Sequence, residues 1–192
     1  MDKQITIIGA GIIGICTAYY LAKNHKLSNI VLIDRNNPMS LTSAASGENY
    51  RNWWPQPEMF AFINRSIDLM EEIARTTKNR INMTRRGYAL ATRHKNIDEF
   101  INELKAGMKG LDERLLRHQT KQNSNSYLKS ITNNWETTPN GVDVIQNRQL
   151  IRTAFPNYAD DVETVIHIRR GGDIDSQQLG QIMIEHLREV GV

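Results

Sequence analysis

The sequence predicts an α/β fold that opens with a strand–helix–strand unit, and three observations near its start support this. Ile5 to Ile8 form a short run of β-branched residues, which is typical of a buried parallel strand. From Gly11 to about Lys23, apolar residues recur at helical spacing. A second apolar run, Ile30 to Ile33, completes a βαβ unit of the usual length, roughly thirty residues.

Length and composition limit the number of domains and the class of protein. Its 192 residues, 40% hydrophobic and 23% charged, suit a globular protein of one domain and part of another. The net charge of +3 is slight and its basic residues are scattered, so no nucleic-acid partner is expected. No transmembrane segment is predicted. A single cysteine, Cys16, permits no intrachain disulfide, so we expect a cytoplasmic protein.

A glycine pattern joins the first strand to the first helix. Gly9, Gly11 and Gly14 form G-x-G-x-x-G, in which the first glycine permits a tight turn and the second admits a pyrophosphate close to the backbone. The third lets helix and strand pack closely, and the helix N-terminus attracts anions. Asp34 ends the second strand, where a carboxylate accepts hydrogen bonds from ribose hydroxyls and repels the 2′-phosphate of NADP. These residues predict a dinucleotide site.

Further elements follow from hydrophobic periodicity and from start and stop signals. We expect helices over 57–75, 96–108, 147–154 and 175–190, and strands over 88–92 and 162–168. Asn96 and Glu99 are expected to cap the second of these helices, and Asp175 the last. Residues 35–57 are expected to form a long functional loop. Residues 112–140 are polar, with sparse anchors such as Ile131, and are expected to form a peripheral segment with weak helical pieces.

The loop sequence from Thr42 to Arg51, T-S-A-A-S-G-E-N-Y-R, resembles a known family when taken with the glycine turn and Asp34-Arg35. It resembles the FAD-dependent D-amino acid oxidase superfamily, which includes glycine, sarcosine and dimethylglycine oxidases and dehydrogenases. In that family this loop wraps the phosphates and ring of the flavin. Gly87 to Leu90 resemble its first substrate-domain strand, and Gly172 to Asp175 resemble the return to the FAD domain.

The resemblance implies a Rossmann-like FAD-binding βαβ unit with part of an α+β substrate domain, incomplete relative to the family. The expected divisions are residues 1–80 for the N-terminal part of the FAD domain, 81–170 for the partial substrate domain and 171–192 for the returning helix. The residues implied to bind FAD are Gly9, Gly11, Ile12, Ile13, Gly14, Asp34, Arg35, Ser43, Ala44, Ala45, Ser46 and Gly47. Arg35 would lie near the adenine, and Gly47 against the flavin ring.

The implied function is an FAD-dependent oxidoreductase that oxidises a small amine or amino acid at its C–N bond by hydride transfer to the flavin. No residue is assigned as catalytic. Asn49 and Arg51 are candidates to contact the flavin or a substrate carboxylate, because a guanidinium binds a carboxylate through two hydrogen bonds. No metal site is expected, since the five histidines lack the spacing of metal ligands.

Three departures from the family pattern leave alternatives open. Asp34 stands where the family usually has the longer Glu, although it can still bind a ribose. Glu48 stands where the family often has a second glycine, and its carboxylate is expected to point to solvent or to disfavour a nearby anionic substrate. The chain is also shorter than family members. One alternative is therefore a non-catalytic remnant, or half of a split protein that needs a partner chain or the missing C-terminal half. An NAD-linked oxidoreductase is the other.

Three groups of side chains have competing interpretations. Trp53 and Trp54 form either a packed wedge or an aromatic wall near the flavin, and the wedge is favoured. The pairs Arg85-Arg86 and Arg169-Arg170 are either solvated charges or a guide for an acidic substrate, and solvation is favoured. His167 is expected to serve packing, although its strand keeps a functional role open.

Overall fold

The computed structural model describes residues 4–108, 113–120, 127–130 and 135–192. The chain divides into two compact units. Unit 1 comprises Met1–Glu48, Thr77–Asn82 and Ile174–Val192, and unit 2 comprises Asn49–Thr76 and Met83–Asp173. Residues 49–76, which the sequence assigned to the first domain, therefore fall in unit 2. Each unit is described by itself.

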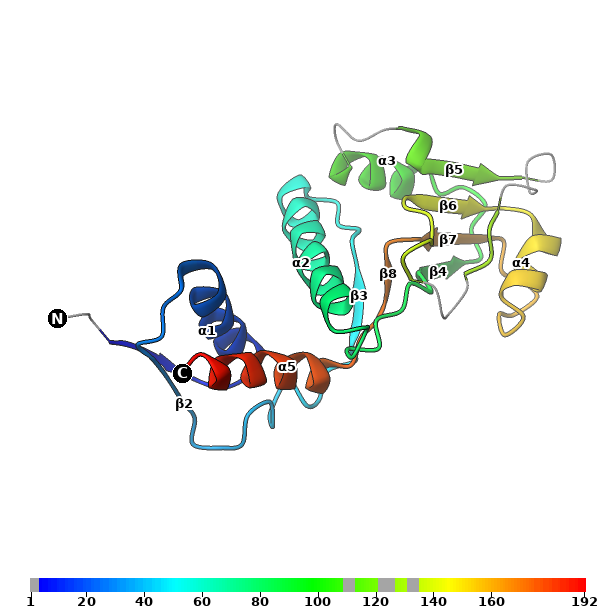
Figure 1. Cartoon of the computed structure of the whole chain (residues 1–192). Coiled ribbons are helices and arrows are strands. Elements are labelled where there is room, and N and C mark those ends of the chain that lie inside the picture. The colour runs from blue at the N-terminus through cyan, green and yellow to red at the C-terminus, as the bar shows by residue number, and fades with distance from the viewer. Residues whose placement is uncertain (1–3, 109–112, 121–126, 131–134) are drawn as a thin grey trace. The chain divides into compact units, whose positions relative to one another are not determined.

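Unit 1 contains the βαβ unit that the sequence predicts. Its elements are β1 (Ile5–Ile8), α1 (Ile12–His25), β2 (Ile30–Ile33) and α5 (Ser176–Glu189). The two strands are parallel, with Ile5 opposite Ile30 and Ile8 opposite Ile33. Helices α1 and α5 lie side by side (Figure 1), although some 150 residues separate them in the sequence, on the order of a whole small domain.

The core of unit 1 lies on one face of its sheet. Ala18 and Ala22 of α1 and Leu187 of α5 pack there against Ile30. On the opposite face Ile8 is 87% exposed and Ile33 is 49% exposed. Parallel strands are normally covered on both faces. Within the part of the chain that the structure describes, this sheet has two strands and cover on one face.

Unit 2 is built on a four-stranded mixed sheet of order β4-β7-β6-β5 (Figure 1). Strands β5 and β6 are parallel, whereas β7 is antiparallel to both β4 and β6. A separate antiparallel pair joins β3 to β8. The strands are β3 (Asn49–Arg51), β4 (Tyr88–Thr92), β5 (Leu116–Gln119), β6 (Val142–Ile145), β7 (Thr164–Ile168) and β8 (Gly171–Asp173). The helices are α2 (Pro57–Thr76), α3 (Asp98–Gly107), the single 3₁₀ turn η1 (Glu113–Leu115) and α4 (Arg148–Ala154).

Helices cover both faces of this sheet. Ile101 and Leu104 of α3 pack over Val144 and Ile166 on one face. On the other, Ile151 of α4 packs with Ile145, Val162 and Val165. Strands β6 and β7 are buried at every residue. They therefore form the centre of the unit.

The structure differs from the sequence prediction in four short strands and one helix cap. Strand β3 lies inside the expected loop, and β5 lies where weak helical pieces were expected. Strands β6 and β8 were not predicted. In β6 the charged Asp143 interrupts the apolar run, and in β8 two of the three residues are glycines. At α3 the N-cap is Ile97, and Asn96 Oδ1 instead accepts a bond from the Asp98 amide. The expected anchor Ile131 lies outside the described residues.

The solvated environment expected for Arg169 is wrong, because its side chain lies in a charged cluster buried in the sheet. Arg169 is fully buried, with Nη1 3.5 Å from the Asp143 carboxylate. Arg117 binds the same carboxylate through two hydrogen bonds of 2.8 and 3.0 Å. Two cations thus share one buried anion, and Gln119 donates a further bond to it. A buried charge is tolerated when it is paired in this way.

His167 sits in the same cluster and is 2% exposed. Its Nδ1 accepts from the Tyr127 hydroxyl at 3.0 Å and from Arg169 at 3.1 Å, and its Nε2 donates to the Arg86 carbonyl at 2.8 Å. These partners suit the neutral imidazole with its proton on Nε2. Burial, followed by the charge of Arg169, lowers the pKa of His167 to about 4 from 6.5.

The stability of unit 2 is expected to fall in mild acid because of His167. Between pH 6.5 and about 4, the unfolded chain binds a proton on this histidine that the folded chain does not. The free energy of unfolding should therefore be insensitive to His167 above pH 6.5 and fall by up to about 3 kcal/mol below it. Urea denaturation followed by tryptophan fluorescence measures this, because Trp53, Trp54 and Trp135 all belong to unit 2.

The matched comparison is His167→Gln with His94→Gln, since the His94 side chain is exposed. We expect His167→Gln to flatten the pH dependence and His94→Gln to leave it unchanged. A profile as steep in His167→Gln as in the wild type would contradict the assignment.

Candidate functional site

The three glycines of the turn in unit 1 differ in why a side chain is disfavoured or tolerated at their positions. Gly9 has φ +110°, a conformation that L side chains rarely adopt. A Cβ on Gly14 would overlap the Gly9 carbonyl, so this glycine permits the close approach of α1 to β1. A Cβ on Gly11, however, would meet Ser43 Oγ at an ordinary 3.6 Å. Backbone conformation thus requires Gly9 and packing requires Gly14, whereas a Cβ on Gly11 would cause no clash.

Amide groups at the start of α1 face the neighbouring loops. The Ile12 amide donates to Ser43 Oγ at 3.1 Å. The Ala10 amide donates to Asp34 Oδ2 at 2.7 Å, and the Asn36 amide donates to Asp34 Oδ1 at 2.8 Å. The Asn36 and Ala10 amides hold the pKa of the Asp34 carboxyl below its ordinary value. An ionised, exposed acceptor therefore stands at the end of β2 beside a helix N-terminus that favours anions.

A cavity of about 570 Å³ runs along these residues. Of the residues predicted from sequence, seven line it: Gly9, Gly11, Ile12, Ile13, Gly14, Asp34 and Ser43. The other five, Arg35, Ala44, Ala45, Ser46 and Gly47, do not line the cavity and are exposed on unit 1. The donors, the dipole, the carboxylate and the cavity beside Gly11 fit a dinucleotide whose pyrophosphate lies at the helix N-terminus.

Met39 contributes to this site but was missed from the sequence. It has φ +61°, is buried and lies against Gly180 of α5, where any Cβ would crowd its side chain. The Met39 amide also donates to the Ala10 carbonyl. Met39 thus fixes the loop after β2 to the glycine turn. The sequence signal that could have identified Met39 is that it is an apolar residue within a mostly polar loop.

Glu48 does not take either of the positions expected for it. Its carboxylate accepts two bonds at the start of α5, from the Ser176 amide at 2.9 Å and from the Ser176 hydroxyl at 2.8 Å. These bonds, the hydroxyl first, hold the pKa of Glu48 below its ordinary value. Glu48 has φ +58°, the left-handed conformation that glycine adopts without strain. The backbone thus keeps the shape that the family glycine permits, while the side chain binds α5.

In unit 2 the candidates Asn49 and Arg51 lie on β3, opposite Asp173 and Gly171 of β8. The Arg51 guanidinium lies over two rings, with its Cζ 4.6 Å from the Tyr88 centroid and 5.3 Å from the Trp54 centroid. Within the described residues it has no carboxylate partner. Stacked arginines keep their planar N–H fork available. Arg51 is therefore a fixed cation with open donors.

The two tryptophans after β3 have different surroundings. Trp53 packs against Phe100 of α3 at 4.8 Å between ring centroids, in the core of unit 2, as the wedge interpretation expected. Trp54 instead forms one wall beside Arg51. The packed wedge therefore describes Trp53, whereas the aromatic wall near a flavin stays a prediction for Trp54.

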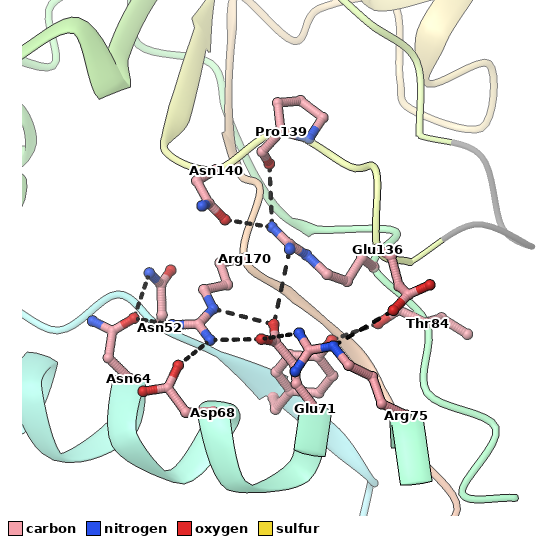
Figure 2. Close-up of polar contacts among 12 residues, drawn as sticks. Asn52, Asn64, Asp68, Glu71, Arg75, Thr84, Glu136, Pro139, Asn140 and Arg170 are labelled. Carbon is pink, nitrogen blue, oxygen red and sulfur yellow. Dashed lines mark hydrogen bonds and ion pairs between the residues drawn. The ribbon is translucent and has the colours of Figure 1, made fainter. Parts of the chain in front are cut away.

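A network centred on Glu71 of α2 fixes the backbone next to Arg51 (Figure 2). Glu71 is buried and binds Arg170 at 3.1 Å, Arg75 at 3.4 Å and Arg85 at 3.8 Å. The Arg170 carbonyl accepts from the Asn52 amide, one residue after Arg51. Because Arg85 is buried, the solvated environment expected for it is wrong. Loss of one partner would leave a buried charge uncompensated, which is strongly destabilising.

Metal-ligand groups and membrane-spanning helices are absent from the part of the chain that the structure describes. In it, no three His, Cys, Asp or Glu side chains are grouped so that they could hold a metal ion. None of its helices is both long enough and apolar enough to cross a membrane.

Several solved structures share this fold across nearly the whole chain. Glycine oxidase from Bacillus cereus ATCC 14579 matches with a TM-score of 0.67 and 13% identity, over 99% of this chain and 46% of its own. L-proline dehydrogenase from P. horikoshii matches with a TM-score of 0.69 and 16% identity, over 99% and 42%. Iminodiacetate oxidase from Chelativorans sp. BNC1 matches with a TM-score of 0.67 and 21% identity, over 98% and 45%. The chain spans less than half of each structure.

A curated relative matches part of the chain at higher identity. L-saccharopine oxidase of Schizosaccharomyces pombe is 45% identical over 49 residues, which are 26% of this chain and 11% of that protein. The family profile described as FAD dependent oxidoreductase (DAO) matches residues 4–192. Together with the glycine turn and the Rossmann-like fold, this match shows that the chain belongs to the DAO family of FAD-dependent oxidoreductases.

Proposed function

We propose that unit 1 binds FAD and that the protein oxidises a small amine or amino acid at its C–N bond. The observation that carries this proposal is the single cavity along which the glycine turn, the α1 N-terminus, Asp34 and Ser43 meet. Family membership supports FAD as the ligand. Bound FAD would accept a hydride from the carbon next to nitrogen, and the protein's share is binding, orientation and electrostatics.

Within this proposal, different residues of unit 1 bind different parts of FAD. The amides of Gly11 and Ile13 bind the pyrophosphate, and Ile12, whose amide donates to Ser43 Oγ, lines the cavity between them. Asp34 accepts hydrogen bonds from the adenosine ribose, because its carboxylate oxygens keep further lone pairs beside the bonds from Ala10 and Asn36. Arg35 lies at the adenine side. The exposed residues Ala44, Ala45, Ser46 and Gly47 cover the ribityl and ring side of the flavin.

Arg51 is proposed to bind the carboxylate of an amino-acid substrate, with Asn49 as a neighbouring contact. Its guanidinium is held by Tyr88 and Trp54 and has no carboxylate of the described chain to neutralise it. A carboxylate ligand would supply the missing charge through two parallel hydrogen bonds.

Turnover is proposed to need more polypeptide than the described units provide. The exposed face of the unit 1 sheet, with Ile8 and Ile33, is apolar surface that a parallel sheet normally covers. The structural relatives are more than twice as long as the portion that this chain spans. The remainder of the fold would come from a further segment or from a partner chain.

The first test is whether the chain binds FAD. We expect purified protein to quench flavin fluorescence on titration with FAD, with no comparable binding of NAD as the matched nucleotide control. The loop of residues 43–47 resembles flavin-wrapping loops, which is why FAD is favoured. Protein that stays colourless with excess FAD would contradict the proposal, and preferential NAD binding would favour an NAD-linked enzyme instead.

Alanine at Gly11 and at Gly14 should separate ligand binding from folding. Gly11→Ala places its Cβ at ordinary van der Waals distance from Ser43 Oγ, so the melting temperature should remain unchanged while FAD affinity falls about tenfold or more. Gly14→Ala forces α1 away from β1 and should destabilise unit 1 itself. Thermal denaturation and fluorescence titration give the two readouts. Wild-type FAD affinity in Gly11→Ala would place the pyrophosphate elsewhere.

Arg51→Met should abolish recognition of a carboxylate ligand. Calorimetric titration of the FAD-saturated protein with N-methylglycine measures the affinity, and methylamine is the ligand control without a carboxylate. We expect Arg51→Met to weaken N-methylglycine binding by about tenfold or more, because two charge-assisted hydrogen bonds are lost. Arg65→Met, an exposed change on α2, should have no effect. Equal losses in both variants would argue against a specific role for Arg51.

A further inference from the structure

The loop of residues 43–48 is attached to α5 at both of its ends. At one end the Ser43 carbonyl lies 3.3 Å from Ser176 Oγ, and at the other the Glu48 carboxylate accepts from the same hydroxyl at 2.8 Å. A hydroxyl has one hydrogen, so the shorter bond to Glu48 is the principal one. Residues 44–47 between these ends are exposed. One serine side chain therefore closes the loop.

Three polar groups of Glu48 form hydrogen bonds, and two of these groups bond to residues at the start of α5 or just before it. Its amide donates to Ser46 Oγ at 3.0 Å within the loop, and its carbonyl accepts from the Ile174 amide at 3.1 Å. Its carboxylate accepts from the amide and the hydroxyl of Ser176, the first residue of α5. Asp175, the N-cap, accepts from the Gln178 amide instead, so the two carboxylates satisfy different amides of the first turn. The positive end of the helix dipole adds to the attraction for both.

The left-handed backbone conformation of Glu48 must be stabilised by other contacts. Its φ of +58° is disfavoured for a residue with a Cβ, and such conformations persist where surrounding contacts over-determine them. Here those contacts are the bonds from Ser176 and Ile174. Compared with the glycine of the family pattern, Glu48 disfavours this backbone conformation, but its carboxylate bonds to α5.

The other end of the same loop leads to the nucleotide cavity. Ser43 Oγ accepts from the Ile12 amide at the start of α1, where the proposed pyrophosphate lies. Ser176 therefore lies against Ser43, which binds the start of α1, and it is bonded to Glu48 at the end of the loop that is proposed to cover the flavin. We propose that Glu48 and Ser176 act as a clasp that holds the loop of residues 43–48 in its FAD-binding conformation. This inference rests on the proposed function for its ligand, and Glu48 and Ser176 are positioning residues in it.

The test combines two measurements on the same set of variants. Hydrogen–deuterium exchange of peptides covering residues 41–50 reports loop opening in the ligand-free chain, and titration with FAD reports affinity. The variants are Glu48→Ala, Glu48→Gly, Glu48→Gln and Ser176→Ala. Glu189→Ala, an exposed change at the far end of α5, is the matched control.

We expect Glu48→Ala to increase loop exchange and weaken FAD binding by about tenfold each, the usual effect of losing hydrogen bonds to a charged group. Glu48→Gly should do the same although it relieves the backbone, because the carboxylate is what closes the clasp. Glu48→Gln keeps the acceptor oxygen and should stay within about threefold of the wild type. Ser176→Ala should add no further loss to Glu48→Ala, since the two residues share one interaction.

Wild-type exchange and wild-type affinity in Glu48→Gly would overturn the clasp. So would Glu48→Gln as damaging as Glu48→Ala, or losses of Glu48→Ala and Ser176→Ala that simply add. Should Glu48→Ala not fold, Glu48→Gln and Ser176→Ala decide the matter through the same two readouts. A wild-type chain that fails to bind FAD would refute the proposed function, while the exchange data would still test the clasp independently.

Discussion

The close approach of α1 to β1 at Gly14 is the constraint on which the nucleotide site depends. Only a residue without a Cβ lets the helix start against the Gly9 carbonyl, and this places the α1 amides beside the carboxyl end of the strand. From there Ala10 reaches Asp34 and Ile12 reaches Ser43, so both flanking loops take their position from the same turn. A helix displaced by one methyl group would move the amides, the dipole and both loop anchors together.

Unit 2 depends on a different principle, the sharing of buried carboxylates between arginines. Asp143 receives Arg117 and Arg169 inside the sheet, and Glu71 receives three arginines at the end of α2. Burial, followed by repulsion from neighbouring arginines, lowers the pKa of Arg85 and Arg169, which shows the cost of removing these cations from water. Their pairing compensates that cost and fixes geometry. It also holds β3, the strand that carries Arg51, at a defined position.

Much of unit 1 could be predicted because its signals are local. The glycine spacing, the two β-branched runs and Asp34 each follow from a few adjacent residues, and the structure assembles them into one cavity. The short strands of unit 2 could not, because Gly171 and Gly172 of β8 have no strand propensity and are ordered by pairing with β3. Arg86 is exposed as expected, but the environment of Arg85 was mispredicted for the same reason, since it binds Glu71 and Asn140, which are distant in sequence. The role of Glu48 depends on Ser176, 128 residues away.

The division of unit 1 among three separated segments has a consequence for synthesis on the ribosome. Its first segment ends at Glu48, whereas the helix that covers α1 begins at Ser176. At typical elongation rates of about 5–20 residues per second, the first segment waits on the order of ten seconds before α5 exists. During that interval the apolar surface of Ala18, Ala22 and Ile30 lacks Leu187. The core of unit 1 is therefore completed only after the stretch that forms most of unit 2 has been made.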